Sequence, residues 1–217
     1  MTQTLHPFQA PLLCATHAVA LLGTVILPPL VWRAGKTAAA VRYDALTALH
    51  TLLARRRVTA GALAPQLSPA GQLLPLLLQS MDEDWYVDTR RMGCAALAQV
   101  FRVAGAALDD AARRSVYPEL NKRMDDSSNA VRVAAAAAIV AFAEDALPHD
   151  YCDTNSGYFV AALLIHLDDG SAEVQAAVQA ALCALAAKKG AVVRAEIGKV
   201  HAQFRSKFLL DQVLERC

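Results

Sequence analysis

The sequence has few aromatic residues and almost no net charge. Aromatic side chains make up 6% of the 217 residues, and 21 basic against 20 acidic side chains leave a formal charge of +1. This balance supplies no broad positive field, which argues against nucleic acid as a partner. Neither a GxxxxGK(S/T) nor a GxGxxG phosphate loop occurs, so the common nucleotide-binding motifs are also absent.

Cysteine is sparse and lacks metal-site spacing. The five cysteines are widely spaced and include no CxxC pair: Cys14, Cys94, Cys152, Cys183 and Cys217. They predict reduced thiols rather than a disulfide framework. The run from His149 to Asp153 holds ligand-type side chains without zinc spacing and predicts a plain loop. We therefore predict no catalytic residues, no cofactor and no metal, which argues against an enzyme.

One long uncharged run lies near the N-terminus. Residues 12–30 contain no Lys, Arg, Asp or Glu, as a membrane span would require. The run includes Gly23, Pro28 and Pro29, and no basic residue precedes it as in a signal peptide. These features argue against a membrane role. We predict an N-terminal apolar helix over residues 1–24, the remnant of a preceding repeat.

An acidic turn recurs with a fixed period. Met124-Asp125-Asp126 returns as Leu167-Asp168-Asp169, 43 residues later, and Met81-Asp82-Glu83 lies 43 residues earlier. Each turn leads into an Ala-rich run, and alanine has the highest helix propensity. A period in the forties with helices on both sides of a turn is typical of HEAT repeats. The sequence thus predicts an all-α HEAT-type solenoid of about four antiparallel helix pairs plus a C-terminal helical cap.

The repeats are predicted to occupy residues 25–190, and two capping helices residues 191–217, with Gly190 as a helix C-cap. Gly61, Pro65 and Ser68 predict a loop in which Ser68 caps the next helix. The stretch from Ala130 to Phe142 contains Arg132 as its only charge. A helix that is apolar all round is buried all round, so we expect it in the middle of the array.

Repeated polar residues predict a structural ladder between neighbouring repeats. Each acidic turn precedes a helix N-terminus, which favours a carboxylate cap. A polar side chain follows within the helix and can reach its own turn or the neighbouring one. The predicted ladder consists of Arg42, Asp82, Arg90, Asp125, Arg132, Asp168 and Gln175.

The same turns also predict a surface for protein partners. Seven carboxylates in the turns would form an acidic ridge able to bind a basic peptide, although solvated helix caps are their ordinary role. Polar stripes on the second helices are expected on the concave side, and two tryptophans lie in turns. The candidate partner contacts are Trp32, Trp85, Asp84, Asp126, Asp169, Arg91, Arg102 and Gln179.

Three stretches resemble the C-terminal HEAT repeats of the dynein axonemal assembly factor 5 family. They are Ile26-Leu27-Pro28 through Trp32 to Arg42, Val116-Tyr117-Pro118 through Asp126, and Leu163 to Asp169. The resemblance covers most of residues 25–217. It implies a non-enzymatic cytoplasmic scaffold that assembles axonemal dynein chains with chaperones before transport into cilia or flagella. Family members are longer, with further repeats ahead of this region, and the family offers no catalytic residue to transfer.

Two other functions stay open at this stage. A HEAT array can bind tubulin through turn residues such as Trp32, although acidic turns would repel acidic tubulin. It can also serve as the regulatory subunit of an enzyme, which the fold alone does not exclude. Microtubule co-sedimentation would separate the first alternative from an assembly scaffold.

Overall fold

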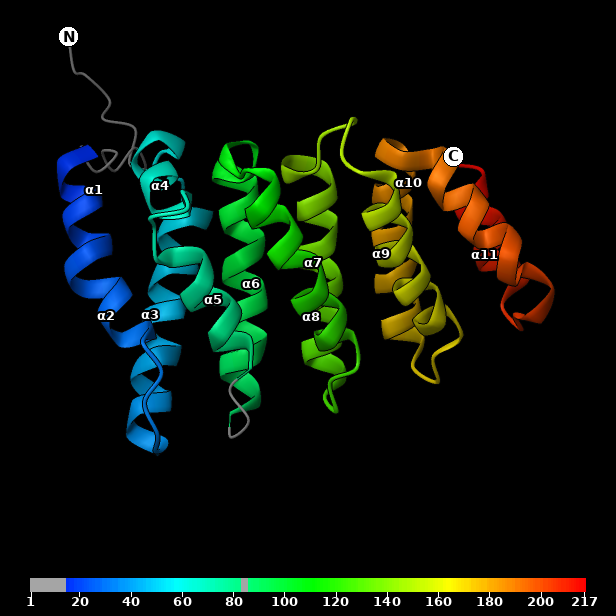
Figure 1. Cartoon of the computed structure of the whole chain (residues 1–217). Coiled ribbons are helices and arrows are strands. Elements are labelled where there is room, and N and C mark those ends of the chain that lie inside the picture. Colours follow the sequence, from blue (N-terminus) through cyan, green and yellow to red (C-terminus); the bar gives the residue numbers. More distant parts are fainter. Residues whose placement is uncertain (1–14, 83–85) are drawn as a thin grey trace, which may run out of the picture.

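The computed structural model describes residues 15–82 and 86–217, which form helices and short helical turns without a strand. The helices stand side by side in two rows, and the chain runs from one end of the array to the other (Figure 1). This arrangement confirms the predicted all-α solenoid.

Each repeat pairs a first-row helix with a second-row helix. The first pair is α1 (Ala15–Leu21), η1 (Leu22–Ile26) and α2 (Leu27–Leu30) with α3 (Lys36–Ala54). The next pairs are α4 (Ala60–Leu67) and α5 (Leu73–Met81) with α6 (Val87–Ala104), α7 (Asp110–Met124) with α8 (Asn129–Ala141), and α9 (Asp153–Ile165) with α10 (Ala172–Val200). The short turns η2 (Gly105–Ala107), η3 (Phe142–Ala146), η4 (His166–Asp168) and η5 (His201–Gln203) connect them, and α11 (Lys207–Leu214) ends the array.

Small residues at equivalent positions let the second-row helices approach one another. Ala96, Ala138 and Ala181 lie one repeat apart on α6, α8 and α10, and all three are fully buried. Helix α8 contacts both α6 and α10, as expected for the apolar stretch in mid-array. The helix is not buried all round as predicted, because Ala130 and Ala137 are exposed. Close packing of alanine faces thus forms the centre of the core.

The N-terminal apolar segment belongs to the first repeat. Helical backbone runs without a break from Ala15 to Leu30, across the boundary that the sequence suggested after residue 24. The π-helical turn η1 ends two residues before Pro28, and in a regular α-helix the rings of Pro28 and Pro29 would each press against an earlier carbonyl group. Residues 1–14 lie outside the described part of the chain.

The loop predicted around Gly61 and Pro65 is instead helix α4. Thr59 is its N-cap and accepts a hydrogen bond from the Ala62 amide at 3.3 Å. Ser68, expected to start the next helix, ends this one as C-cap. Burial of three apolar side chains of α4 against the core outweighs the low helix propensity of glycine and proline.

The predicted helix end at Gly190 lies next to a kink in α10, where two helical segments meet. Lys189 has non-helical angles (φ −132°, ψ 42°), and helical structure continues to Val200.

Among the described residues, the segment Ala172–Gln203 alone has the length and hydropathy of a membrane span, a test that core helices of soluble proteins also pass. It packs here against α8, α9 and α11.

Candidate functional site

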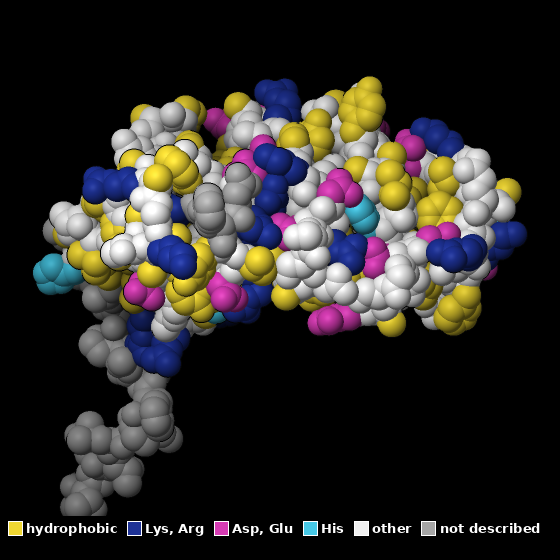
Figure 2. Space-filling view, turned by 90° about the horizontal axis from the view of Figure 1, so that it is seen from below, with side chains coloured by type: hydrophobic (Ala, Val, Ile, Leu, Met, Phe, Trp, Pro, Cys, Tyr) yellow, Lys and Arg dark blue, Asp and Glu magenta, His cyan; other side chains and the backbone are white. Residues whose placement is uncertain are grey.

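The turns before α6, α8 and α10 lie along one edge of the array, here called the turn edge. Figure 2 looks onto this edge and shows basic and acidic side chains intermingled. The described carboxylates are therefore not a ridge of one sign. Two sets of polar contacts between neighbouring repeats account for the mixture.

The first set joins a second-row arginine to the following turn. Arg90 on α6 donates to Asp126 through Nε (2.6 Å) and Nη2 (2.9 Å). One repeat later, Arg132 on α8 forms the same kind of pair with Asp169. The side chains of Arg90 and Asp126 are only 8% and 3% exposed. Such bidentate pairs fix the register of one repeat on the next.

The ladder uses the second aspartate of each turn, where the sequence suggested the first. Asp126 Oδ1 also accepts from the Ser128 amide at 2.9 Å, and Asp169 Oδ1 from the Ser171 amide at 2.8 Å. These bonds turn both carboxylates inward before α8 and α10. Asp126 and Asp169, proposed as partner contacts, are therefore occupied within the protein.

The first aspartate of each turn makes a second set of contacts, with the end of the next first-row helix. Arg123 Nη2 and Lys122 Nζ each lie 2.8 Å from Asp82 Oδ1. At the next repeat, His166 Nε2 lies 3.6 Å from Asp125 Oδ1. The carboxylate of Asp168 completes the series at the C-terminal cap.

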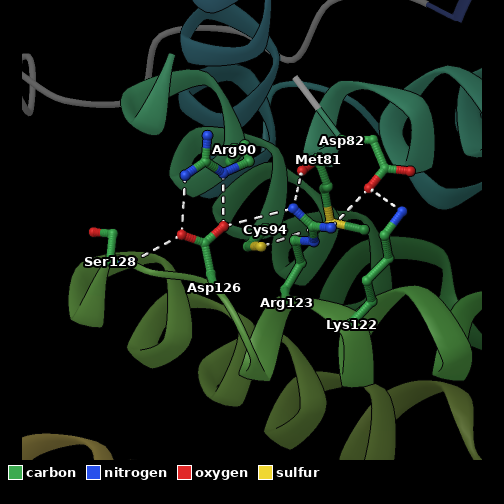
Figure 3. A network of polar contacts seen from close by, with 8 residues as sticks. All are labelled: Met81, Asp82, Arg90, Cys94, Lys122, Arg123, Asp126 and Ser128. Atoms are coloured by element: carbon green, nitrogen blue, oxygen red, sulfur yellow. Dashed lines mark hydrogen bonds and ion pairs between the residues drawn. The ribbon is translucent and has the colours of Figure 1, made fainter. Parts of the chain in front are cut away.

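Figure 3 shows how Arg123 connects the two ladders. Its Nη1 donates to the Met81 carbonyl at 2.8 Å and lies 3.5 Å from Asp126 Oδ2. Burial raises the pKa of Asp126, but the hydrogen bonds and charges of its partners outweigh burial and hold that pKa below its ordinary value. Burial also raises the pKa of the Cys94 thiol, which lies beside this network, to about 12. The thiol is thus a protonated core group, as expected.

Arg123 could have been recognised in the sequence as a ladder residue. It stands directly before the Met124-Asp125 turn, and His166 occupies the equivalent place before Leu167-Asp168.

No such repeat position marks Lys189 in the sequence. Its buried ammonium group donates to the Tyr151 carbonyl and to Asp153 Oδ1, and thereby ties the kink of α10 to the start of α9.

The ladder differs at its two ends. Arg42, on α3 in the repeat before that of Arg90, is 1% exposed. Gln175 donates to the carbonyl of Asp169 in its own turn at 2.8 Å and does not reach the C-terminal cap. Asp168 contacts the cap instead, which makes this contact a suitable target for mutation.

We expect Asp168→Ala to loosen the C-terminal cap. Asp168 Oδ2 accepts from the Arg205 amide and Oδ1 from the Ser206 amide, both at 2.9 Å. Loss of a capping carboxylate weakens such an attachment by about 1 kcal/mol. Hydrogen exchange of the Arg205 and Ser206 amides should accelerate about fivefold, while that of α8 stays unchanged. Unchanged exchange at both amides would contradict this role.

The His166 rung predicts a pH dependence of stability. Burial lowers the pKa of His166, although Asp125 and Asp169 raise it and Arg132 lowers it further. As the pH falls, the unfolded chain therefore binds a proton at this histidine before the folded chain does. Protonation of His166 thus lowers the free energy of unfolding as the pH falls below about 6.5. In His166→Gln, the free energy of unfolding should decrease less between pH 7 and pH 5. Burial and Arg102 also lower the pKa of His50, so the variant should keep part of the dependence of its stability on pH.

The other candidate contacts differ in their surroundings. Trp32 is 46% exposed in the turn between α2 and α3 and stays available to a partner. Arg91 bonds Asp88 at 3.2 Å, and Gln179 bonds Gln212 of α11, so both already have partners within the chain. Arg102 is exposed on α6. Trp85 and Asp84 lie outside the described residues.

No group of three or more His, Cys, Asp or Glu side chains that could hold a metal ion occurs within the described residues. In the same part of the chain, Cys94 and Cys183 are free thiols, as are Cys152 and Cys217.

Comparison with known proteins identifies relatives of the chain. The model of a family described as "Stalled ribosome sensor GCN1-like, HEAT repeats" matches residues 26–197. Dynein axonemal assembly factor 5 of Homo sapiens is 33% identical over 158 residues, which cover 71% of this chain and 18% of that protein. The Mus musculus protein of the same name is 32% identical over 204 residues, covering 89% and 23%. These matches confirm the resemblance found in the sequence.

The chain spans about a fifth of the length of these curated relatives. Among solved structures, a designed armadillo repeat protein has a TM-score of 0.62 at 19% identity, with 93% of this chain and 86% of that one covered. The structural similarity concerns the fold alone.

Proposed function

The chain belongs to the HEAT-repeat family whose model describes GCN1-like stalled ribosome sensors, and we propose that it is a non-enzymatic scaffold in the assembly of axonemal dynein. The observation that carries the proposal is the similarity to dynein axonemal assembly factor 5 over 71% to 91% of the chain. Its proposed partners are axonemal dynein chains and chaperones, and its proposed location is the cytoplasm, where dynein arms would be assembled before transport into cilia or flagella.

The polar ladders support a scaffold role. Inter-repeat pairs such as Arg90 with Asp126 satisfy the charges of the turn edge within the chain. Repeats held in fixed register present their free surfaces in a fixed arrangement, which lowers the entropy lost when a partner binds. Partners of the proposed scaffold would therefore bind surfaces other than the paired carboxylates of the turns.

Affinity capture from ciliated cells during regrowth of their cilia tests the proposal. The chain carries an affinity tag, and captured proteins are identified by mass spectrometry against a tag-only control. Enrichment of dynein heavy and intermediate chains together with chaperones supports the assembly role. Capture of an enzyme's catalytic subunit without dynein would contradict it and favour the regulatory alternative.

Tubulin binding is the second candidate, favoured by the exposure of Trp32 beside Val31 in a turn. Microtubule co-sedimentation of the wild-type chain and of Trp32→Ala tests it. Binding that depends on Trp32 would replace the assembly proposal. Absence of the chain from the microtubule pellet would remove this alternative.

A further inference from the structure

A pocket lies between the C-terminal parts of α3 and α6, at the opposite end of these helices from the turn edge. Its volume is about 560 Å³. The lining residues are Leu53, Ala54, Arg56, Val58, Thr59, Gln99, Arg102 and Val103. Leu53 and Val58 are buried, whereas Arg56 and Arg102 are exposed. The pocket thus combines an apolar floor with a cationic rim.

Within the described part of the chain, Arg56 and Arg102 at the rim of this pocket have no carboxylate partner. The sequence contains three arginines and no carboxylate between Asp44 and Asp82, although the whole chain is nearly neutral. No Asp or Glu is among the lining residues, and within the described part of the chain neither Arg56 nor Arg102 forms an ion pair. At the turn edge, by contrast, the arginines have carboxylate partners.

The positive charge of Arg102 also acts on a side chain of the neighbouring helix, His50. His50 is half-buried on α3, and Arg102 lies on α6. Burial lowers the pKa of His50, and the positive charge of Arg102 lowers it further. A carboxylate that entered the groove would meet an attractive potential of the same origin.

Arg56, at the rim of the pocket, has a backbone conformation that residues other than glycine rarely adopt. Its φ is 51°, in the left-handed region that favours glycine. The Arg56 amide donates to the Leu53 carbonyl and the Arg57 amide to the Leu52 carbonyl, both at 2.8 Å. This is the Schellman pattern, in which glycine is the usual residue at the position of Arg56. Replacement by glycine should therefore remove the charge and leave the turn intact.

We propose that this pocket binds an acidic peptide segment in which an apolar side chain lies between carboxylates. The apolar side chain would contact Leu53, Val58 and Val103, and the carboxylates would pair with Arg56 and Arg102. The inference rests on the proposed scaffold function, because it specifies one contact site and the chemistry of its partner. Nucleic acid fits less well, because no aromatic side chain lines the pocket to stack on a base.

Fluorescence anisotropy with synthetic peptides tests the pocket. The probe is a fluorescein-labelled 12-residue peptide with two leucines among Glu and Asp, and its counterpart carries Gln and Asn at the acidic positions. Loss of one charge-assisted contact weakens binding by about tenfold. We expect Arg56→Gly and Arg102→Gln each to weaken binding of the acidic peptide by about that factor, and higher salt to weaken wild-type binding.

Arg91→Gln is the matched control, because Arg91 lies on the same helix and pairs with Asp88 away from the pocket. It should bind as the wild type does, and Arg56→Gly should melt at the same or a higher temperature. Equal binding by the double variant Arg56→Gly/Arg102→Gln, or by the amide counterpart, would overturn the proposal. Displacement of the peptide by a 12-nucleotide single strand at lower concentration would overturn the peptide assignment.

The capture experiment separates this proposal from the proposed function. If wild type and double variant capture dynein chains equally, the scaffold function stands and the pocket assignment fails. If neither captures dynein, the scaffold function fails, whereas the peptide titration still decides the chemistry of the pocket.

Discussion

Asp126→Ala should lower the free energy of unfolding by about 3–5 kcal/mol, because it removes a carboxylate that two buried arginines share. Arg90 bonds this carboxylate through two nitrogens, and Arg123 lies within 3.5 Å of it. The side chains of both arginines are at most 10% exposed. The substitution also removes the acceptor of the Ser128 amide at the start of α8. Urea denaturation followed by circular dichroism measures the change.

The neighbouring residue supplies the control. The side chain of Asp125 is 80% exposed, and its Oδ1 lies 3.6 Å from His166 Nε2. Asp125→Ala should therefore change the free energy of unfolding by no more than about 0.5 kcal/mol. Equal effects of the two substitutions would show that the inward orientation of Asp126 is not the source of its stabilisation.

This pair of aspartates also marks the limit of prediction from the sequence. The period of 43 residues correctly predicts that polar residues join neighbouring repeats. It does not show which of two adjacent carboxylates faces inward, because that choice depends on the backbone of the turn. The bond from the Ser128 amide to Asp126 fixes the orientation, and the same bond recurs between Ser171 and Asp169.

Local residue preferences fail where tertiary burial is strong. Gly61 and Pro65 predict a loop, yet Leu63 and Leu67 are buried and hold α4 in a helical conformation. Pro28 and Pro29 likewise suggest a helix boundary, but Leu27 and Leu30 beside them pack in the core. The alanine and leucine periodicity of the long helices is the reliable part of the sequence signal, because packing and propensity agree there.

The pocket between α3 and α6 could not be found from repeat spacing. Arg56 follows α3, whereas Arg102 lies near the end of α6, and only the stacking of the two repeats brings them to one cavity. The sequence favours a solvated helix end for the three consecutive arginines. The distinguishing evidence is the apolar floor formed by Leu53 and Val58, which a solvated turn does not require.

Phe142→Ala is the second substitution for which we expect a loss of about 3–5 kcal/mol in the free energy of unfolding. Phe142 is 1% exposed, and its ring centroid lies 5.3 Å from that of Phe101 and 6.0 Å from that of Phe159. These three rings come from consecutive repeats, since Phe101 lies on α6 and Phe159 on α9. The alanine would leave a cavity at the junction of three repeats and remove two aromatic contacts.

The matched control is Phe208→Ala, because the Phe208 side chain on α11 is 70% exposed. Its removal should change the free energy of unfolding by about 0.5 kcal/mol or less. Since each repeat contacts mainly its neighbours, the loss at Phe142 should also appear as faster hydrogen exchange in α6, α8 and α9, with less change in α3. Uniform acceleration over the whole array would contradict this and indicate that the repeats unfold as a single unit.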